Sequence, residues 1–330
     1  MNVLITGGAG FIGSHLAERC LAEGWRVTVL DDLSTGAFEN IAHLKTKPAF
    51  SYRIESVFNE PLVGELVDSA DVVFHLAAAV GVKLVMGSPV RTIETNVHGT
   101  EVVLRCAAKK GKSVMLASTS EVYGRSMSRL FREEDDLVLG PTNIGRWSYA
   151  ASKALDEWLA LAYWRERGLP VTVLRFFNTV GPRQTDRYGM VLPTFVRQAL
   201  RGEPLTIHHT GQQRRCFSYV GDVVEAMVRL AQTPAAVGEI VNIGNDREVT
   251  INELAALVRE ITGSPSSVEH VPYDQAYGPG FEDMDRRVPC LEKLESLVHY
   301  RPATSLEAIV RRVVDCEWVR LSKSFSTVTV

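Results

Sequence analysis

A tyrosine and a lysine stand four residues apart in "WSYAASKALDEW", at Tyr149 and Lys153. Side chains with this spacing share one face of a helix, so both groups can act at one place. The ordinary pKa of a phenol is about 10, and an ammonium one turn away favours the phenolate, which can then serve as a general base. The pair also occurs by chance on amphipathic helices. The case for a catalytic pair therefore depends on a third group, a hydroxyl from "STS" at 118–120. This hydroxyl could hydrogen-bond to the substrate oxygen that Tyr149 deprotonates.

A glycine-rich turn gives the second chemical signal. "GGAGFIG" places Gly7, Gly10 and Gly13 between a strand and a helix, so that a diphosphate can lie on the helix N-terminus. The next strand ends at Asp31, where a carboxylate can bind ribose hydroxyls and repels a 2′-phosphate, as does its neighbour Asp32. The sequence therefore predicts NAD rather than NADP as cofactor.

The elements around these groups alternate between apolar strands and helices. Continuous apolar runs that alternate with helical segments, such as 11–23 and 91–109, indicate a parallel sheet covered on both faces. We predict an α/β fold: a doubly wound parallel sheet of the Rossmann type that binds NAD, in residues 1–176. The expected strands are 2–6, 26–30, 71–76, 113–118 and 171–176.

The composition of the chain changes after about residue 176, where Pro, Gly and Arg become more frequent and the expected helices and strands become shorter. We predict that 177–320 forms mainly a second, smaller α/β domain that binds the substrate. A return of the chain to the sheet is expected near 238–244, so the two domains need not be separated at a single point in the sequence. The last segment, 321–330, lacks a helical period and is expected to be a disordered tail.

Composition excludes several classes of function. The chain has 330 residues, of which 45% are hydrophobic, and a formal net charge of −3, which gives no case for a nucleic acid or membrane partner. It starts on a strand without a signal-peptide pattern, so a cytoplasmic location is expected. Five scattered cysteines lack metal-ligand or disulfide spacing, so we expect reduced thiols and no metal.

Several motifs together resemble the extended short-chain dehydrogenase/reductase superfamily, and within it the nucleotide-sugar epimerases, dehydratases and decarboxylases. The resemblance covers about 2–319 through "GGAGFIG", "HLAA", "STSEVYG", "YAASK", "RFFNTVGPR", "QRRCFSYVGDV" and "NIGN". It implies a homodimer formed through the helices near 91–109 and 149–167. It also implies that Thr119 is the catalytic hydroxyl, with Tyr149 as base and Lys153 as its partner. Asn96 takes a scaffold position, and the residues implied to lie beside the cofactor are Phe11, Ile12, Leu76, Ala77 and Ala78.

The same resemblance implies a UDP-sugar substrate. Asn178, Arg215 and Arg287 match groups that bind the diphosphate, where the bidentate guanidinium suits phosphate oxygens. The residues that match the border of the uracil ring are Val191, Ile207 and His208.

The motifs look most like enzymes acting on UDP-glucuronic acid, whose oxidation at C4 gives a β-keto acid. Glu121 and Arg287 match residues of the decarboxylases, whereas "GPRQ" at 181–184 looks like the uronate 4-epimerases and "RVP" replaces the decarboxylase "RKP". We therefore prefer the 4-epimerase that interconverts UDP-glucuronic and UDP-galacturonic acid. In that hypothesis Thr119, Ser120 and Arg183 hold the carboxylate near the ketone plane, so that CO2 is retained.

Three alternatives stay open. The first is a UDP-glucuronate decarboxylase, and the second is a UDP-glucose 4-epimerase. The third is an NAD-sensing regulatory protein without catalysis, which is disfavoured because both Tyr149 and Lys153 are present. A net dehydrogenase is disfavoured because no cysteine falls at a recognisable nucleophile position.

Overall fold

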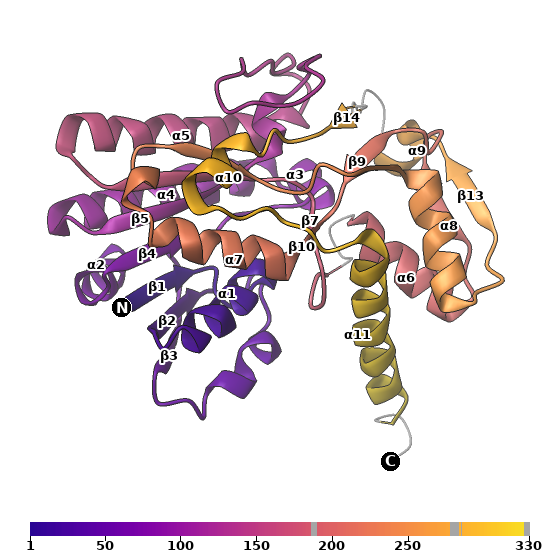
Figure 1. The fold of residues 1–330 in the computed structure, drawn as a ribbon, viewed down its shortest axis with the longest axis horizontal. Helices are drawn as coiled ribbons and strands as arrows, with labels where there is room; N and C mark the ends of the chain where they lie inside the picture. Colours follow the sequence, from indigo (N-terminus) through magenta and orange to yellow (C-terminus); the bar gives the residue numbers. More distant parts are fainter. Residues whose placement is uncertain (186–189, 278–283, 285, 327–330) are drawn as a thin grey trace.

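A central parallel sheet forms the larger part of the molecule (Figure 1). The computed structural model describes residues 1–185, 190–277, 284 and 286–326, with only the backbone described at 82, 83 and 323–326. The sheet has seven strands in the order β11-β6-β5-β4-β1-β2-β3, and all neighbours are parallel. The strands are β1 (Asn2–Thr6), β2 (Arg26–Asp31), β3 (Phe50–Ile54), β4 (Val72–His75), β5 (Ser113–Thr119), β6 (Val171–Phe176) and β11 (Ile240–Ile243).

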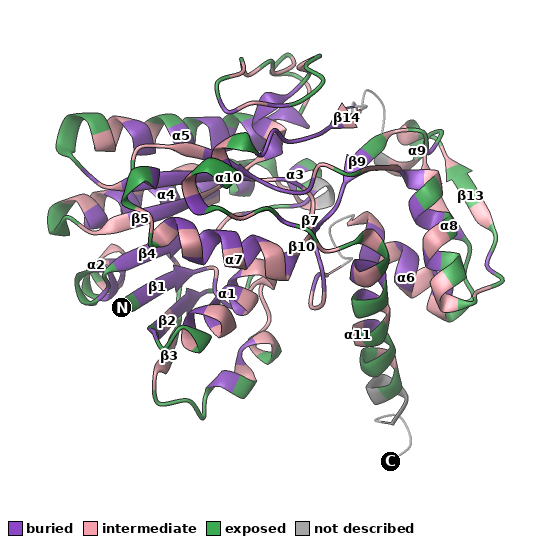
Figure 2. Ribbon diagram, in the orientation of Figure 1, coloured by how far each residue is buried: buried purple, intermediate pink, exposed green. Residues whose placement is uncertain are grey.

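Helices cover both faces of this sheet, as the apolar runs of its strands require. The buried side chains form one core with α1 (Phe11–Ala22), α7 (Val220–Ala231) and α10 (Glu292–Val298). A second core lies on the opposite face with α2 (Glu60–Ser69), α4 (Pro89–Lys110) and α5 (Trp147–Arg167). Figure 2 shows the strands between these layers as largely buried. Short helices lie in the connections: η1 (Phe38–Asn40), η2 (Ala42–Leu44), α3 (Val82–Gly87), η3 (Ser120–Tyr123) and η4 (Pro234–Ala236).

A smaller lobe lies beside the carboxyl end of the sheet and has its own apolar core (Figure 1). Its helices are α6 (Val191–Arg201), α8 (Ile251–Thr262), α9 (Tyr273–Tyr277) and α11 (Leu306–Ser326). Its strands form three small sheets: β7 (Thr179–Val180) with β10 (Ser218–Tyr219); β8 (Leu205–His208) with β13 (Val268–Val271); and β12 (Glu248–Thr250), β9 (Arg214–Cys216) and β14 (Arg286–Arg287). Helix α8 starts with a reciprocal cap between Thr250 and Glu253, which fixes where β12 ends.

The predicted fold class, a doubly wound parallel sheet with a smaller α/β domain, is confirmed. β11 joins the sheet beside β6 within the segment where a return is expected, and α7 and α10 also pack on the sheet, so the chain passes between the lobes several times. The expectation of a disordered tail from residue 321 is wrong as far as Ser326, because α11 continues to that residue. Residues 327–330 lie outside the described part.

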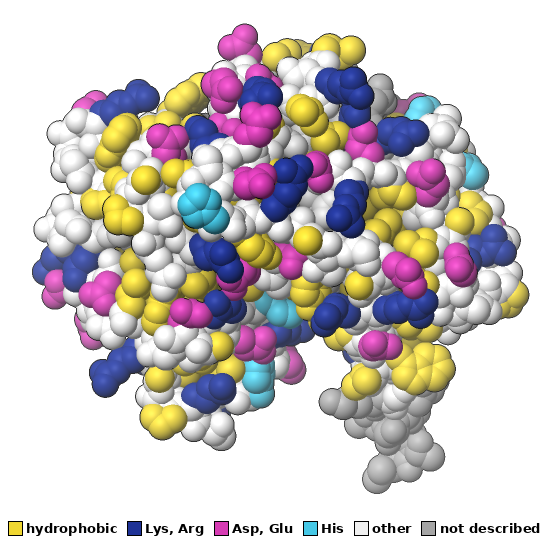
Figure 3. Space-filling model, viewed as in Figure 1, with side chains coloured by type: hydrophobic (Ala, Val, Ile, Leu, Met, Phe, Trp, Pro, Cys, Tyr) yellow, Lys and Arg dark blue, Asp and Glu magenta, His cyan; other side chains and the backbone are white. Residues whose placement is uncertain are grey.

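The charges on one face of the molecule, the apolarity of the described helices and the state of the cysteines can be compared with the expectations from composition. On the face shown in Figure 3, acidic and basic side chains are interspersed, so that face carries no field of one sign. Among the described helices, none combines the length and apolarity that crossing a bilayer requires. All five cysteines are free thiols, four of them buried, and Cys316 is half-buried.

Candidate active site

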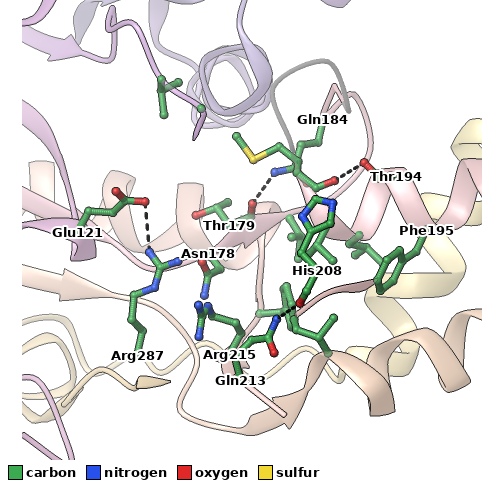
Figure 4. A pocket seen from close by; sticks show the side chains of 18 of the residues that line it. Glu121, Asn178, Thr179, Gln184, Thr194, Phe195, His208, Gln213, Arg215 and Arg287 are labelled. Carbon is green, nitrogen blue, oxygen red and sulfur yellow. Dashed lines mark hydrogen bonds and ion pairs between the residues drawn. The ribbon is translucent and has the colours of Figure 1, made fainter. Parts of the chain in front are cut away.

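A cavity of about 450 Å³ lies where the carboxyl end of the sheet faces the smaller lobe. Both lobes line it, and in parallel α/β sheets this is where ligands bind. Figure 4 shows polar side chains that line it, among them Glu121 from η3, His208 from β8, Arg215 from β9 and Arg287 from β14. The predicted site residues that line the cavity are Thr119, Glu121, Tyr149, Asn178, Val191, His208, Arg215 and Arg287.

Tyr149 faces this cavity from the first turn of α5 and is 8% exposed. Burial raises the pKa of its phenol, the carboxylate of Glu121 raises it further, and a hydrogen bond with Thr119 acts in the opposite direction. The structure thus brings two of the three predicted catalytic groups together at the cavity wall. A positive charge delivered by a ligand would favour the phenolate there.

Lys153 lies on the same helix but inside the protein, with 3% of its side chain exposed. Its ammonium donates a hydrogen bond to the buried carboxylate of Asp156 at 2.6 Å. The sequence analysis did not identify Asp156 as a partner of this lysine.

Two buried hydrogen-bond chains hold α5 in place. Asn96 on α4 accepts from the backbone of Ala79 at 2.9 Å and donates to Ser152 at 3.0 Å, and Ser152 donates to the carbonyl of Tyr149 at 2.8 Å. The predicted scaffold position of Asn96 therefore links the loop after β4 to the start of α5. Farther along the helix, Glu157 pairs with Arg175 on β6 at 2.7 Å.

The glycine-rich turn is shaped to accept a diphosphate. Gly7 has a φ of 69°, and a side chain there would lie 2.7 Å from the backbone nitrogen of Ala77. A side chain at Gly13 would lie 2.3 Å from the carbonyl oxygen of Gly7. Gly10 is the N-cap of α1 and makes no side-chain cap, so the first turn presents backbone N–H groups. These features fit NAD.

The residues predicted to contact the cofactor lie around the glycine-rich turn, and one of them has a further role. Phe11 and Ile12 begin α1, and 76–78 follow β4 directly beside the turn. Asp31 accepts hydrogen bonds from the backbone of Ala9 at 2.9 Å and of Leu33 at 2.8 Å. Its carboxylate thus fixes the glycine-rich turn itself, and burial raises its pKa. A ribose contact of Asp31 stays a prediction.

Two arginines stand side by side on the wall contributed by the smaller lobe. Arg215 on β9 and Arg287 on β14 are register partners in a parallel pair, and both are nearly buried, at 5% and 9% exposed. Like charges at paired positions of a sheet repel each other unless an anion lies near both. Asn178 extends from the end of β6 toward the same place and donates to the carbonyl of Cys216 at 3.1 Å. The arrangement suits a diphosphate.

We expect Arg215→Ala to weaken the binding of UDP by about 30-fold, since a hydrogen-bonded charge of this kind contributes roughly 2 kcal/mol. Isothermal titration with UDP measures the effect. Arg214→Ala is the matched control, because Arg214 is the exposed neighbour on the same strand and should leave affinity unchanged. Equal losses in both variants would show that only the general positive charge matters.

Among the described residues that line the cavity, Glu121 is the acidic one, and it lies between two arginines. Arg146 donates a short hydrogen bond to one carboxylate oxygen, and Arg287 lies 3.4 Å from the other (Figure 4). Arg146 is 3% exposed and lines the cavity, yet the sequence analysis missed it. Its place three residues before Tyr149, ahead of the helix, was the available signal.

Three predicted substrate contacts are not supported by the structure. Arg183 turns away from the cavity, with its guanidinium 2.7 Å from Glu18 and 2.8 Å from His15. Ser120 is 1% exposed, because the tight turn of η3 directs it inward. Ile207 is 1% exposed in the core of the smaller lobe, because alternation along β8 sends its neighbours Thr206 and His208 to the cavity instead.

Two loops that bear on the prediction are described only in part. Of the loop at 181–190, residues 186–189 lie outside the described residues, and so do 278–283 and 285 of the segment that leads to Arg287. Other residues that the sequence analysis did not identify line the cavity: Gln184, Met190, Phe195, Thr206, Gln213 and Tyr273.

Comparison with known proteins places this geometry among nucleotide-sugar enzymes. The sequence pattern of the NAD-dependent epimerase/dehydratase family matches residues 3–244. The UDP-N-acetyl-alpha-D-glucosaminuronate decarboxylase of Bacillus cytotoxicus is 42% identical over 96% of this chain and 97% of its own length. UDP-glucuronic acid decarboxylase 1 of Danio rerio is 35% identical over 95% of this chain and 72% of its own. The crystal structure of the Bacillus cereus UDP-glucuronic acid 4-epimerase with UDP-glucuronic acid and NAD superposes with a TM-score of 0.88 at 28% identity, covering 97% of this chain and all of that one.

Proposed function

The chain belongs to the NAD-dependent epimerase/dehydratase family, and we propose that it is a decarboxylase acting on a UDP-linked uronic acid. The observation that carries this proposal is the position of Glu121. Its carboxylate lies in the same cavity as Tyr149, held by Arg146 and Arg287. The similarity to two decarboxylases supports the same conclusion. The 4-epimerase hypothesis loses one of its supports, because Arg183 faces Glu18 rather than the cavity.

Oxidation at C4 prepares the sugar for loss of CO2. Tyr149 takes the proton of the 4-hydroxyl, and Thr119 shares a hydrogen bond with the same oxygen. Bound NAD supplies the acceptor for the hydride on C4. The glycine-rich turn and the first turn of α1 hold its diphosphate.

The 4-keto uronate is then a β-keto acid. Its C5–carboxylate bond breaks, the electron pair moves into the ketone as an enolate, CO2 leaves, and C5 takes a proton from water on the side where Glu121 and Arg287 meet. The hydride held by the cofactor would then return to C4, and the proton on Tyr149 would return to O4, which gives the pentose and restores the starting state of the site. Two carboxylates held side by side repel each other. Glu121 therefore favours the step that turns the substrate carboxylate into neutral CO2, while the arginines keep that carboxylate in place.

The decisive experiment offers purified protein UDP-glucuronic acid and, separately, its 2-acetamido counterpart, and follows the sugar signals by proton NMR. A pentose nucleotide formed with release of CO2 is the expected result. A C4 epimer with all six carbons would identify a 4-epimerase, which the similarity to the Bacillus cereus enzyme makes the second candidate. Turnover of UDP-glucose alone would remove the uronate from the proposal.

We also propose a homodimer through α4 and α5. These two helices carry four apolar side chains that are more than two-fifths exposed: Val90 (68%), Ile93 (44%), Leu155 (46%) and Trp158 (63%). A second copy of the chain would cover them, since exposed apolar groups gathered on neighbouring helices favour association.

Trp158→Glu is expected to weaken dimerisation by about 30-fold or more, because a central tryptophan typically contributes at least about 2 kcal/mol to an interface. Sedimentation velocity over a range of concentrations measures the shift. Trp318→Glu, on α11 and equally exposed at 61%, is the control that should leave assembly unchanged. A dimer that survives Trp158→Glu and dissociates with Trp318→Glu would place the interface on α11.

A further inference from the structure

A buried carboxylate stands behind the proposed base and has no part in the chemistry described so far. Asp156 lies on α5, one turn after Lys153, and none of its surface is exposed. Its Oδ2 atom lies 2.6 Å from the Nζ atom of Lys153, which is itself 97% inside the protein. Isolated charges at such a position are costly, so each of these groups requires the other.

Neutral groups surround the pair on the sides of α4 and β4. Thr100 on α4 acts on Asp156 and lowers the pKa of its carboxyl, and its hydroxyl lies 3.2 Å from Nε2 of His75 at the end of β4. Burial, together with the charge of Lys153, lowers the pKa of His75 to about 3. His75 therefore stays uncharged near neutral pH and leaves the ammonium of Lys153 to Asp156.

The other charged groups near Tyr149 belong to the cavity or to a separate ion pair. Glu121 on η3 and Arg146, just before α5, act on the phenol from the cavity side. Glu157 follows Asp156 in sequence, but its carboxylate binds Arg175 on β6. Asp156 is thus the buried carboxylate that pairs with Lys153 and also raises the pKa of Tyr149.

We propose that Asp156 is a positioning residue for the catalytic pair: its carboxylate fixes the ammonium of Lys153 behind Tyr149 and offsets the positive charge that the phenol experiences. The inference rests on the proposed role of Tyr149 as base. Its consequence is a resting site in which the tyrosine keeps its proton. The carboxylate of Asp156 raises the pKa of Tyr149, so formation of the phenolate requires further positive charge, which the nicotinamide ring of bound NAD would supply.

The direction in which the pH profile should move is set by the charge that is removed. A base must be deprotonated, so the rate of substrate oxidation rises with pH through the pKa of Tyr149. Asp156→Asn removes one negative charge and keeps the shape of the side chain. The acid limb of the rate profile should then move to lower pH by about one unit, the size of shift that a neighbouring charge produces.

Two readouts check this. Stopped-flow absorbance of NADH after mixing with UDP-uronate gives the pH profile of the oxidation step. Titration of tyrosinate absorbance without substrate, with the Tyr149→Phe form of each protein subtracted, gives the pKa of Tyr149 in the resting protein independently of turnover. Both should shift in Asp156→Asn, and Asp156→Glu, which keeps the charge, should restore the wild-type midpoint.

Glu157→Gln is the matched control: it removes a buried carboxylate one residue farther along the same helix and should lower thermal stability without moving either midpoint. If folded Asp156→Asn shows unshifted midpoints, Asp156 is only structural and the inference is wrong. If the asparagine variant does not fold, Asp156→Ser makes the same charge change and is judged by the same midpoints. Absence of NAD reduction by every UDP-uronate in the wild-type protein would instead reject the proposed function, while the tyrosinate titration would still test Asp156.

Discussion

Replacing Tyr149 with phenylalanine lowers turnover by about 1000-fold, the typical contribution of a positioned general base. The variant keeps the aromatic ring that lines the cavity and loses only the oxygen that hydrogen-bonds with Thr119. UDP affinity should stay within about twofold, because the side chains of the smaller lobe that we propose bind the diphosphate are unchanged. The measurement is the initial rate of product formation by NMR, with UDP binding measured in parallel.

Tyr123→Phe is the control for this loss. Tyr123 is also a buried tyrosine, but its hydroxyl donates to Asn242 at 2.7 Å within an aromatic cluster away from the cavity wall. Its loss should cost about 1 kcal/mol of folding stability and leave the rate nearly unchanged. Comparable rates in Tyr149→Phe and wild-type protein would exclude Tyr149 as the base.

Glu121→Gln should separate oxidation from decarboxylation. The change removes one negative charge beside Arg146 and Arg287, where the substrate carboxylate is proposed to lie. The two arginines can then pair with the bound carboxylate, and the repulsion that favours CO2 is lost, so we expect CO2 release to slow by about 100-fold. Binding of the uronate should become no weaker.

The first half of the reaction serves as the internal control in this variant. Tyr149 and Thr119 are retained, so bound NADH should still form. It should accumulate, because the 4-keto pentose that would reoxidise it appears only after CO2 is lost. Its absorbance measures oxidation, and trapped CO2 measures the second step. A variant that forms NADH and releases CO2 at the wild-type rates would show that Glu121 has no part in decarboxylation.

Local patterns in the sequence were sufficient to predict the fold and the helix that carries Tyr149 and Lys153. The apolar strands, the glycine turn after β1 and the four-residue spacing of Tyr149 and Lys153 are each determined by neighbours along the chain. The prediction failed where a side chain's direction depends on distant segments. Ile207 and His208 are adjacent in sequence, yet which of them faces the cavity is set by the packing of β8 on the smaller core.

Partners in ion pairs were the least predictable feature. Arg183 binds Glu18, which is 165 residues away, and Arg287 meets Glu121 across 166 residues. Nothing in the local sequence distinguishes these two arginines, because each lies in a polar loop and each could bind phosphate or carboxylate. The three-residue spacing of Lys153 and Asp156 on one helix was enough to predict that they could pair. The burial of both groups could be recognised only in the folded chain.

The parallel pairing of β9 with β14 has a consequence for the order in which the protein is built. During synthesis the glycine turn, β1 and β4 emerge early, whereas Arg287 emerges only after most of the chain has left the ribosome. The sheet itself is closed at its edge by β11, long after β6. A nascent chain can therefore hold the parts proposed to accept the cofactor before it holds both arginines of the proposed diphosphate site, and a chain released before residue 286 has Arg215 without Arg287.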